Sequence, residues 1–165
     1  MTGESEERLD FSLETSGVEE EASLGITLVR LDQEYLGLEV LDVQEVITVD
    51  ILTPLFRLPP HILGVINLRG HVLPVAQLGT LLGLPSAGAT RGVVVRSPAD
   101  AMHQAAFLVD VVIGIRWVRP SSLMEVPPTV EEDRREFFRA LVPGKPAAIL
   151  LRSERLFHSQ SWCTK

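Results

Sequence analysis

Residues capable of chemistry are few in this chain, and their spacing builds none of the common catalytic or metal-binding arrangements. The histidines stand apart at positions 61, 71, 103 and 158, and none is at metal-ligand spacing with another His, Cys or acid. A single cysteine, Cys163, excludes an internal disulfide and leaves no thiol cluster for zinc. The sequence has no G-x-S-x-G elbow, no P-loop and no G-x-G-x-x-G motif. We therefore expect no enzymatic activity, no cofactor and no metal.

One cation stands where a tight turn is expected. Two apolar runs, 62–68 and 71–78, are separated by Arg69 and Gly70 within the stretch Asn67-Leu68-Arg69-Gly70. Turns favour Gly, Asn and Asp for their backbone freedom, and Arg adds nothing to that geometry. A long guanidinium on a hairpin turn can bind a partner's carboxylate or carbonyl groups. Equally, Arg69 can pair with an acid of its own surface, such as Glu45, or remain solvated.

Short strands joined by turns account for most of the chain. Apolar alternation and β-rich runs predict strands over 24–31, 34–40, 62–69, 71–78, 91–96, 104–110 and 111–118. Several of these strands are expected to pair as hairpins, and a further hairpin is expected around a turn at 144–145. Residues 41–49 predict a short turn followed by another strand. Two of the three runs between 91 and 118 are almost purely apolar, which predicts burial on both faces. Helical spacing with Gly83 and Pro85 behind it predicts a short helix over 77–83 with Leu78, Leu81 and Leu82 buried.

The chain partly repeats itself. Residues 36–49 align with 105–118, and residues 72–82 align with 147–157, each copy following a turn that contains glycine. The pattern of many short strands favours an all-β barrel or sandwich over a βαβ fold, and the repeat fits two small β-barrels of similar plan.

Charge is unevenly distributed along the chain. The formal net charge is −7, and residues 1–23 alone hold eight acids and one arginine, so the remaining 142 residues are neutral. We expect an acidic disordered tail over 1–23 that mainly confers solubility. A neutral body lacks the basic surface that phosphate-backbone binding requires, which argues against nucleic acid as a partner. No signal peptide and no apolar run long enough to span a bilayer is present, so we expect a cytoplasmic protein.

Three stretches resemble one known family. The segment "ILGVINLRGHVLPVAQLGTLLGL" (62–84) closely resembles the signature of the CheW-like domain, the coupling protein of bacterial chemosensory arrays. Residues 35–49 are similar to the segment that enters the family's first barrel, and residues 106–123 resemble the Val-Asp-x-Val-x-Gly segment of the second. The resemblance covers essentially all of 24–158.

This resemblance implies a mainly β fold of two SH3-like five-stranded barrels around a shared core, with short helices. The CheW-like domain would span 24–158, its second barrel would begin near residue 90, and 159–165 would form a C-terminal tail. The protein would be a non-catalytic adaptor between the cytoplasmic tips of chemoreceptors (methyl-accepting chemotaxis proteins) and the regulatory domain of a CheA-type histidine kinase. It would lie peripheral to membrane-bound receptor arrays without inserting into the membrane. The implied receptor and kinase interface residues are Val43, Glu45, Gly64, Asn67, Leu68, Arg69 and Gly70.

The chain departs from the family pattern beside the signature. Gln77 and Gly79 stand where the family commonly carries Asp and Arg, and Arg152 stands where an Asp or Asn is common in the second copy. Two alternatives to the receptor–kinase adaptor follow. One is a kinase-binding regulator in a divergent chemosensory pathway, controlling surface motility or development, that does not bind receptor. The other is a small-molecule-binding β-barrel.

Overall fold

The computed structural model describes residues 21–86, 88–158 and 162, and it is built from ten strands with short helical turns. The strands are β1 (Leu24–Leu31), β2 (Glu34–Glu39), β3 (Val43–Thr48), β4 (Ile62–Leu68), β5 (His71–Gln77), β6 (Arg91–Arg96), β7 (Gln104–Val109), β8 (Val111–Val118), β9 (Phe138–Val142) and β10 (Ala148–Leu151). The helices are α1 (Leu78–Leu82), η1 (Pro120–Ser122), α2 (Glu132–Arg135) and α3 (Ser153–Leu156). The predicted strands, hairpins and α1 are therefore present.

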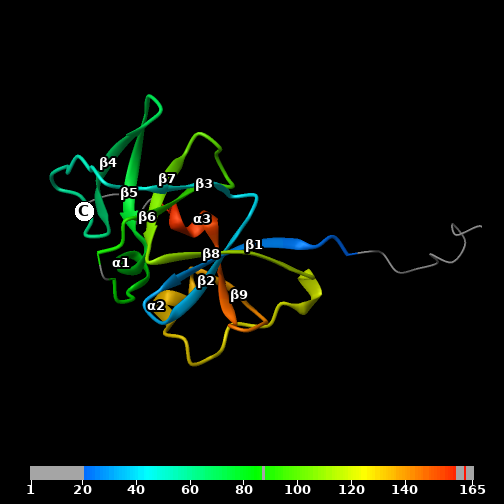
Figure 1. The fold of residues 1–165 in the computed structure, drawn as a ribbon. Coiled ribbons are helices and arrows are strands. Elements are labelled where there is room, and N and C mark those ends of the chain that lie inside the picture. The colour runs from blue at the N-terminus through cyan, green and yellow to red at the C-terminus, as the bar shows by residue number, and fades with distance from the viewer. Residues whose placement is uncertain (1–20, 87, 159–161, 163–165) are drawn as a thin grey trace, which may run out of the picture.

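Two five-stranded sheets confirm the predicted fold class. The first sheet has the order β8-β1-β2-β10-β9, and the second has the order β3-β6-β7-β5-β4 (Figure 1). Each contains one parallel pair, β2 with β10 and β5 with β7, and the other pairings are antiparallel. The two orders match strand for strand when β1–β5 are equated with β6–β10, so the sequence repeat has a direct structural counterpart.

The two copies of the repeat exchange strands. The first copy runs from β1 to α1 and the second from β6 to α3, which places the start of the second copy at Arg91. Nevertheless β3 pairs with β6 of the second copy, and β8 pairs with β1 of the first. Four of the eight strand pairings described join one copy to the other. Neither sheet can therefore form from one copy alone.

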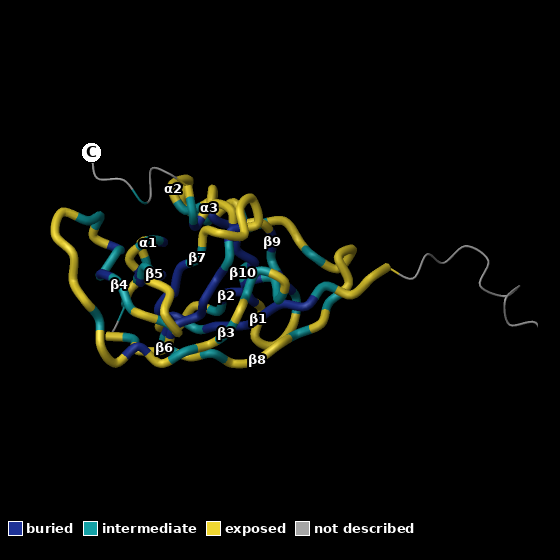
Figure 2. The backbone as a smooth tube through the Cα atoms, turned by 90° about the horizontal axis from the view of Figure 1, so that it is seen from above, coloured by how far each residue is buried: buried dark blue, intermediate teal, exposed yellow. Residues whose placement is uncertain are grey.

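The core lies between and within the sheets (Figure 2). One cluster joins both sheets, with Val29, Leu36 and Leu38 from the first packing near Val93 and Phe107 from the second. Two smaller clusters of buried residues each belong to one sheet, one to the second sheet and the other to the first. Leu78 and Leu82 of α1 are buried and Leu81 packs against the core, as the helical spacing predicted.

Strand β8 is more exposed than its apolar sequence predicts. Residues of β6 and β7 are almost all buried, as the prediction of burial on both faces required. In β8, by contrast, Ile113, Ile115 and Trp117 are 47%, 57% and 65% exposed. It is an edge strand that pairs only with β1 within the described part of the chain, and these three side chains are exposed rather than packed in the core. Apolar composition alone therefore overstates its burial.

The strand exchange predicts that the first copy cannot fold by itself. In a fragment of residues 21–88, only the hairpins β1–β2 and β4–β5 would keep their partners, and isolated two-stranded hairpins are marginal in water. We expect no cooperative thermal transition by circular dichroism and poor dispersion in NMR spectra. Adding the complementary fragment of residues 89–165 should restore both signals. A fragment that unfolds cooperatively alone would contradict the interdependence of the copies.

Candidate functional site

The turn between β4 and β5 holds its arginine in a strained backbone. Arg69 has a φ of 51° and Gly70 a φ of 86°, and two successive positive values are typical of a type I′ hairpin turn. The side-chain oxygen of Asn67 accepts a hydrogen bond from the Gly70 amide at 2.8 Å and fixes the turn. A non-glycine residue in this region costs about 1–2 kcal/mol, so Arg69 occupies a position that its own backbone disfavours.

The guanidinium of Arg69 is paired with Glu45 and still exposed. Its Nη1 and Nη2 donate to the two carboxylate oxygens of Glu45 at 2.6 and 2.8 Å. The Arg69 side chain is 72% exposed, while that of Glu45 is 29% exposed. The hydrogen bond from Arg69 holds the pKa of the Glu45 carboxyl below its ordinary value. Intramolecular pairing, one of the alternatives from the sequence, is thus confirmed, and the pair remains open to solvent.

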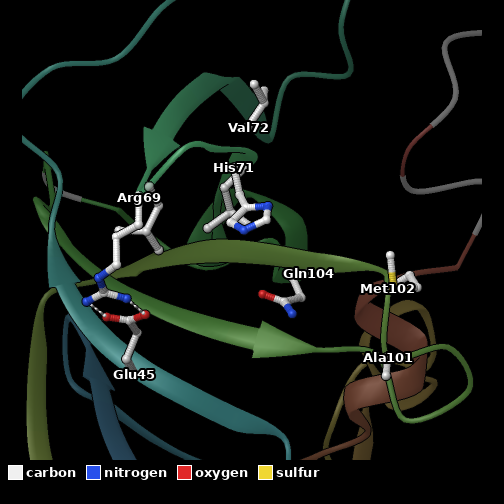
Figure 3. A pocket seen from close by; sticks show the side chains of 9 residues that line it. Glu45, Arg69, His71, Val72, Ala101, Met102 and Gln104 are labelled. Carbon is white, nitrogen blue, oxygen red and sulfur yellow. Dashed lines mark hydrogen bonds and ion pairs between the residues drawn. The ribbon is translucent and has the colours of Figure 1, made fainter.

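This ion pair borders the larger of two hollows beside β3. The hollow has a volume of about 520 Å³ and lies between the β4–β5 turn and the β6–β7 loop. The ion pair stands at one end and Met102 at the other, with His71 and Gln104 between them (Figure 3). Val72 and Met102 are 71% and 88% exposed. The hollow therefore combines a charged pair, two neutral polar groups and an apolar rim.

A second, apolar hollow lies where the exchanged strands approach each other. It has a volume of about 270 Å³ and lies between β3 and β8. Its lining residues are Thr27, Val40, Val43, Gln44, Val46, Val112, Gly114 and Ile115. Val43 thus borders one hollow and Arg69 the other, with β3 supplying side chains to both. These two predicted interface residues therefore lie beside two adjacent hollows rather than in the same one.

The remaining predicted interface residues belong mainly to the turn and its support. Gly64 is buried beneath the segment that leads into β4, where a Cβ would lie 2.2 Å from the carbonyl oxygen of Thr53. Leu68 packs against the core of the second sheet and also lines the larger hollow. Gly70 has open space around its Cα. Contact of Gly64 or of these turn residues with a partner stays a prediction.

An equivalent link occurs at the other sheet, with different chemistry. Arg116 of β8 donates to the carbonyl oxygens of Pro143 and Pro146 in the β9–β10 turn, at 3.3 and 2.7 Å. Strand β8 corresponds to β3 in the repeat, and the β9–β10 turn corresponds to the β4–β5 turn. In both sheets a guanidinium therefore ties the exchanged strand to the hairpin turn. Only in the second sheet is the guanidinium on the turn and its partner a carboxylate.

Metal-ligand clusters and membrane-spanning helices are both absent from the described part of the chain. No cluster of three or more His, Cys, Asp or Glu within residues 21–86, 88–158 and 162 is arranged to hold a metal ion. The helices in the same residues are too short to cross a bilayer.

Comparison with known proteins identifies the family. The family model of the CheW-like domain matches residues 25–161. The chain belongs to the CheW-like domain family. It is 31% identical over 111 residues to the chemotaxis protein CheW of Rhizobium meliloti (strain 1021), covering 67% of this chain and 71% of that protein. A probable chemotaxis protein CheW of Rhizobium etli is 31% identical over 127 residues, covering 76% and 81%.

A solved structure agrees with the family and the fold. The scaffolding protein TtCheW from Thermoanaerobacter tengcongensis superposes with a TM-score of 0.74 at 26% identity, covering 85% of this chain and 96% of that one. The predicted membership of the CheW-like family and the predicted pair of sheets are both confirmed.

The residues that depart from the family pattern have local roles in this member of the family. The side-chain amide of Gln77, immediately before α1, donates a hydrogen bond to the hydroxyl of Ser86. It also accepts a hydrogen bond from the hydroxyl of Thr80 at 3.0 Å. A Cβ on Gly79 would lie 2.9 Å from that of Ser86, so the segment after α1 folds back over the glycine. The guanidinium of Arg152 donates to the carbonyl oxygen of Phe138 at 3.2 Å. A longer side chain at position 79 would displace the segment that now covers it.

Trp162 packs in an aromatic cluster that no local pattern in the sequence indicates. Its ring stacks on Phe157 and meets Phe107 and His61 edge to face, and its indole N–H donates to the carbonyl oxygen of Leu156 at 2.7 Å. His61, in the turn before β4, is buried. Phe107 comes from β7 and Phe157 follows α3, so no local pattern in the sequence could connect them with Trp162.

Sequence reasoning also missed several residues that line the hollows. His71, Val72, Met102 and Gln104 were not singled out, because the β6–β7 loop carries no motif and the start of β5 reads as an ordinary strand. Ile115 was not singled out either, although it lines the apolar hollow. The β6–β7 loop lies beside the β4–β5 turn because β7 pairs with β5, and no local pattern in the sequence indicates that pairing.

The Glu45–Arg69 pair predicts a pH-dependent difference between the natural chain and Glu45→Gln. Because pairing lowers the pKa of Glu45 in the folded state, its contribution to stability is present above the unfolded-state pKa and is lost as pH falls through the folded-state pKa. We expect the natural chain to be slightly more stable at neutral pH and low salt, with the difference vanishing in acid. Urea unfolding across a pH series measures this.

Comparing the two proteins cancels other titrating groups. Burial raises the pKa of Asp42, an effect of opposite sign that is common to both proteins. A stability difference that stayed constant from neutral to acid pH would show that the pair contributes nothing to folding.

Replacing two glycines of the signature by alanine is expected to lower the free energy of unfolding by different amounts. Gly64→Ala combines a φ of 152° with a Cβ 2.2 Å from Thr53 O, and we expect a loss of about 3 kcal/mol. Gly70→Ala has a φ of 86° but open space, and we expect a loss of about 1 kcal/mol. Denaturant unfolding of both variants tests this order. Equal losses would mean that the close approach at Gly64 relaxes easily.

Proposed function

We propose that this protein is a non-catalytic adaptor that couples the cytoplasmic tip of chemoreceptors to the regulatory domain of a CheA-type histidine kinase. It would act on the cytoplasmic side of the membrane, next to receptor arrays. Family membership and the names of its relatives support this role. The observation that carries the proposal is the pair of adjacent hollows on β3, one bordered by an exposed ion pair and one apolar.

The Arg69–Glu45 ion pair suits docking because only some of the N–H donors of Arg69 are used within the pair. Arg69 uses Nη1 and Nη2 toward Glu45, and a guanidinium has five N–H donors, so further donors remain for a partner's oxygen atoms. Pairing with Glu45 also fixes the side chain, which reduces the conformational entropy lost on binding. Strained backbone at an exposed turn is typical of functional sites, since stability alone does not favour it. We infer that Arg69 contacts the receptor.

The apolar hollow supplies the complementary contact. Val43 lines the hollow and packs on the core, while Val46 and Ile115 line it and are 42% and 57% exposed. Burying such side chains contributes roughly 25 cal/mol per Å² of apolar surface. Because Val43 and Glu45 lie on one strand, a partner in the apolar hollow would also reach the ion pair. The receptor would therefore bind across β3.

Rigidity explains how such a body transmits a signal without catalysis. The two sheets share one core and exchange strands, so surfaces on opposite sides keep a fixed relation. A partner held at β3 and another held elsewhere would bias each other through their relative placement. Several weak contacts acting together in an array would then raise the overall affinity.

Arg69→Glu tests the docking role. We expect the variant to fold, because the turn has little packing to lose, and to bind receptor fragments at least about tenfold more weakly in pulldown or calorimetry. The double variant Glu45→Arg/Arg69→Glu is the matched control, since it keeps an ion pair with its charges exchanged. Binding should remain lost in the double variant if the partner contacts the guanidinium. Recovered binding would show that only the intramolecular pair matters.

Val43→Trp tests the apolar hollow separately. We expect the larger ring to fill the hollow and weaken receptor binding while binding of the kinase regulatory domain is retained. Unchanged receptor binding would place the site elsewhere. A natural chain that binds the kinase alone would favour the regulator that does not bind receptor.

A further inference from the structure

The β6–β7 loop presents a methionine to solvent beside the larger hollow. This loop comprises residues 97–103, and its Met102 is 88% exposed. Figure 3 shows Met102 at the end of the hollow that lies opposite the Arg69–Glu45 ion pair. Val72 of β5 lines the same hollow and is 71% exposed. Exposed apolar side chains that gather around a hollow are typical of binding sites, since they add little to the core.

Hydrogen bonds hold the loop in place although it is exposed. Oδ1 of Asp100 accepts a hydrogen bond from the Met102 amide at 2.9 Å, and Oδ2 lies 3.1 Å from Nδ1 of His103. The His103 amide donates to the carbonyl oxygen of Asp100 at 3.0 Å, and the Ser97 amide donates to that of His103 at 2.8 Å. The backbone of Met102 is therefore fixed before a partner arrives, which lowers the conformational entropy lost on binding.

The polar groups of the larger hollow favour a carboxylate on its occupant. Both oxygens of the Glu45 carboxylate already accept hydrogen bonds from Arg69. A guanidinium has five N–H donors, so Arg69 keeps donors for a second carboxylate. The side-chain amide of Gln104, which lies between the ion pair and Met102, can donate as well. The nearby carboxylate of Asp100 already accepts from the loop.

The remaining lining residues favour an apolar side chain on the same occupant. They are Leu68, Val72, Leu73, Ala101 and Met102. Methionine is unbranched and polarisable, so it adapts to the shape of a partner's apolar group. The volume of about 520 Å³ lies within the range of about 300–1,000 Å³ that is typical of binding pockets. The hollow can therefore hold more than one side chain.

Continuity with the apolar hollow favours a protein segment over a small molecule. Glu45 and Val43 lie on one strand, β3, and each lines a different one of the two hollows. An occupant that reaches from the apolar hollow to the ion pair and on to Met102 must be a chain of several residues. The receptor segment that the proposed function places across β3 meets this requirement.

We propose that the larger hollow holds a receptor segment that directs a carboxylate to Arg69 and an apolar side chain to Met102. Met102 is a second docking residue, and Asp100 is a positioning residue that acts through the backbone of the loop. Because the loop belongs to the second copy of the repeat, the receptor contacts both copies. This inference rests on the proposed function and adds to it the chemistry of the partner.

Methyl NMR tests the contact at Met102 directly. The chain has three methionines, at positions 1, 102 and 124, and carbon-13 labelling of their ε-methyl groups gives one signal for each. Met124 is 55% exposed, bridges to Leu141 in the other sheet and lies outside the hollow, so it is an internal control. On titration with a cytoplasmic-tip fragment of the receptor, we expect the Met102 signal to shift and the Met124 signal to stay. Met102→Leu assigns the signal.

Substitutions at two exposed methionines measure the contribution to affinity. By calorimetry, Met102→Asp should bind the receptor fragment at least about tenfold more weakly, because it removes apolar contact and repels the partner's carboxylate. Met102→Leu keeps an apolar side chain and should bind within about twofold of the natural chain. Met124→Asp places the same charge outside the hollow and should leave binding unchanged. Thermal unfolding of each variant checks that the fold is retained.

Two substitutions of Asp100 test its positioning role. Asp100→Ala removes the acceptor of the Met102 amide, so we expect faster hydrogen exchange at that amide and a several-fold loss of affinity. Asp100→Asn keeps an oxygen that can accept the same hydrogen bond and should restore both values. Equal affinity in the natural chain and Asp100→Ala, despite faster exchange, would show that Asp100 positions nothing that the receptor needs.

A double-mutant cycle tests the carboxylate. Each acidic residue of the receptor fragment is changed to its amide and measured against the natural chain and Arg69→Gln. We expect one acid to be coupled to Arg69 by about threefold or more in affinity. The absence of coupling for every acid would overturn the assignment of a carboxylate to this end of the hollow.

The outcomes separate this inference from the proposed function. If the fragment binds while the Met102 signal stays and Met102→Asp binds normally, the inference fails and receptor coupling stands. If the fragment binds neither the natural chain nor any variant, receptor coupling itself fails. If the Met102 signal responds to the kinase regulatory domain and not to the receptor fragment, the hollow belongs to the kinase and the inference is overturned.

Discussion

Strand exchange between the two copies of the repeat is the constraint from which the rest of the molecule follows. Strand β3 pairs with β6 and strand β8 pairs with β1, each a strand of the other copy, and the parallel pairs β2–β10 and β5–β7 join the copies again. The two sheets consequently share one continuous core, with Phe107 and Leu38 in the same cluster. A pair of independently folding halves would be able to move relative to one another, and this arrangement prevents it.

The exchanged strands also locate the functional surfaces. Strands β3 and β8, edge strands of the two sheets, approach each other and enclose the apolar hollow. Strands β3 and β4 are the two edges of the second sheet, and Arg69 and Glu45 bridge the gap between β3 and the β4–β5 turn. The corresponding gap in the first sheet is bridged by Arg116 and backbone carbonyl groups. A carboxylate as partner leaves the Arg69 side chain outside the fold and available, whereas Arg116 is half-buried.

Local patterns in the sequence were sufficient to predict the helices and strands, but they were insufficient to predict which side chains are exposed. The β4–β5 hairpin, α1 and the repeat follow from spacing and turn residues over a few positions, and the structure contains all three. The exposure of Ile115 and the burial of Trp162 depend on strands and helices distant in sequence, which periodicity does not report. For Arg69, the turn was predictable from the sequence, but its position relative to Val43 depends on the register of β3 against β6, which was not.

The exchange has a consequence for how the protein is made on the ribosome. The hairpin of β1 and β2 leaves the ribosome first, yet the residues of β8 that pair with β1 are 81–94 residues further along the chain, and those of β10 that pair with β2 are 113 residues further. At roughly 5–20 residues per second, β2 waits about 6–23 s for β10 during translation. Throughout that interval the apolar side chains of Ile26 and Leu36 lack their final neighbours, so newly synthesised chains depend on rapid completion or on chaperones to avoid aggregation.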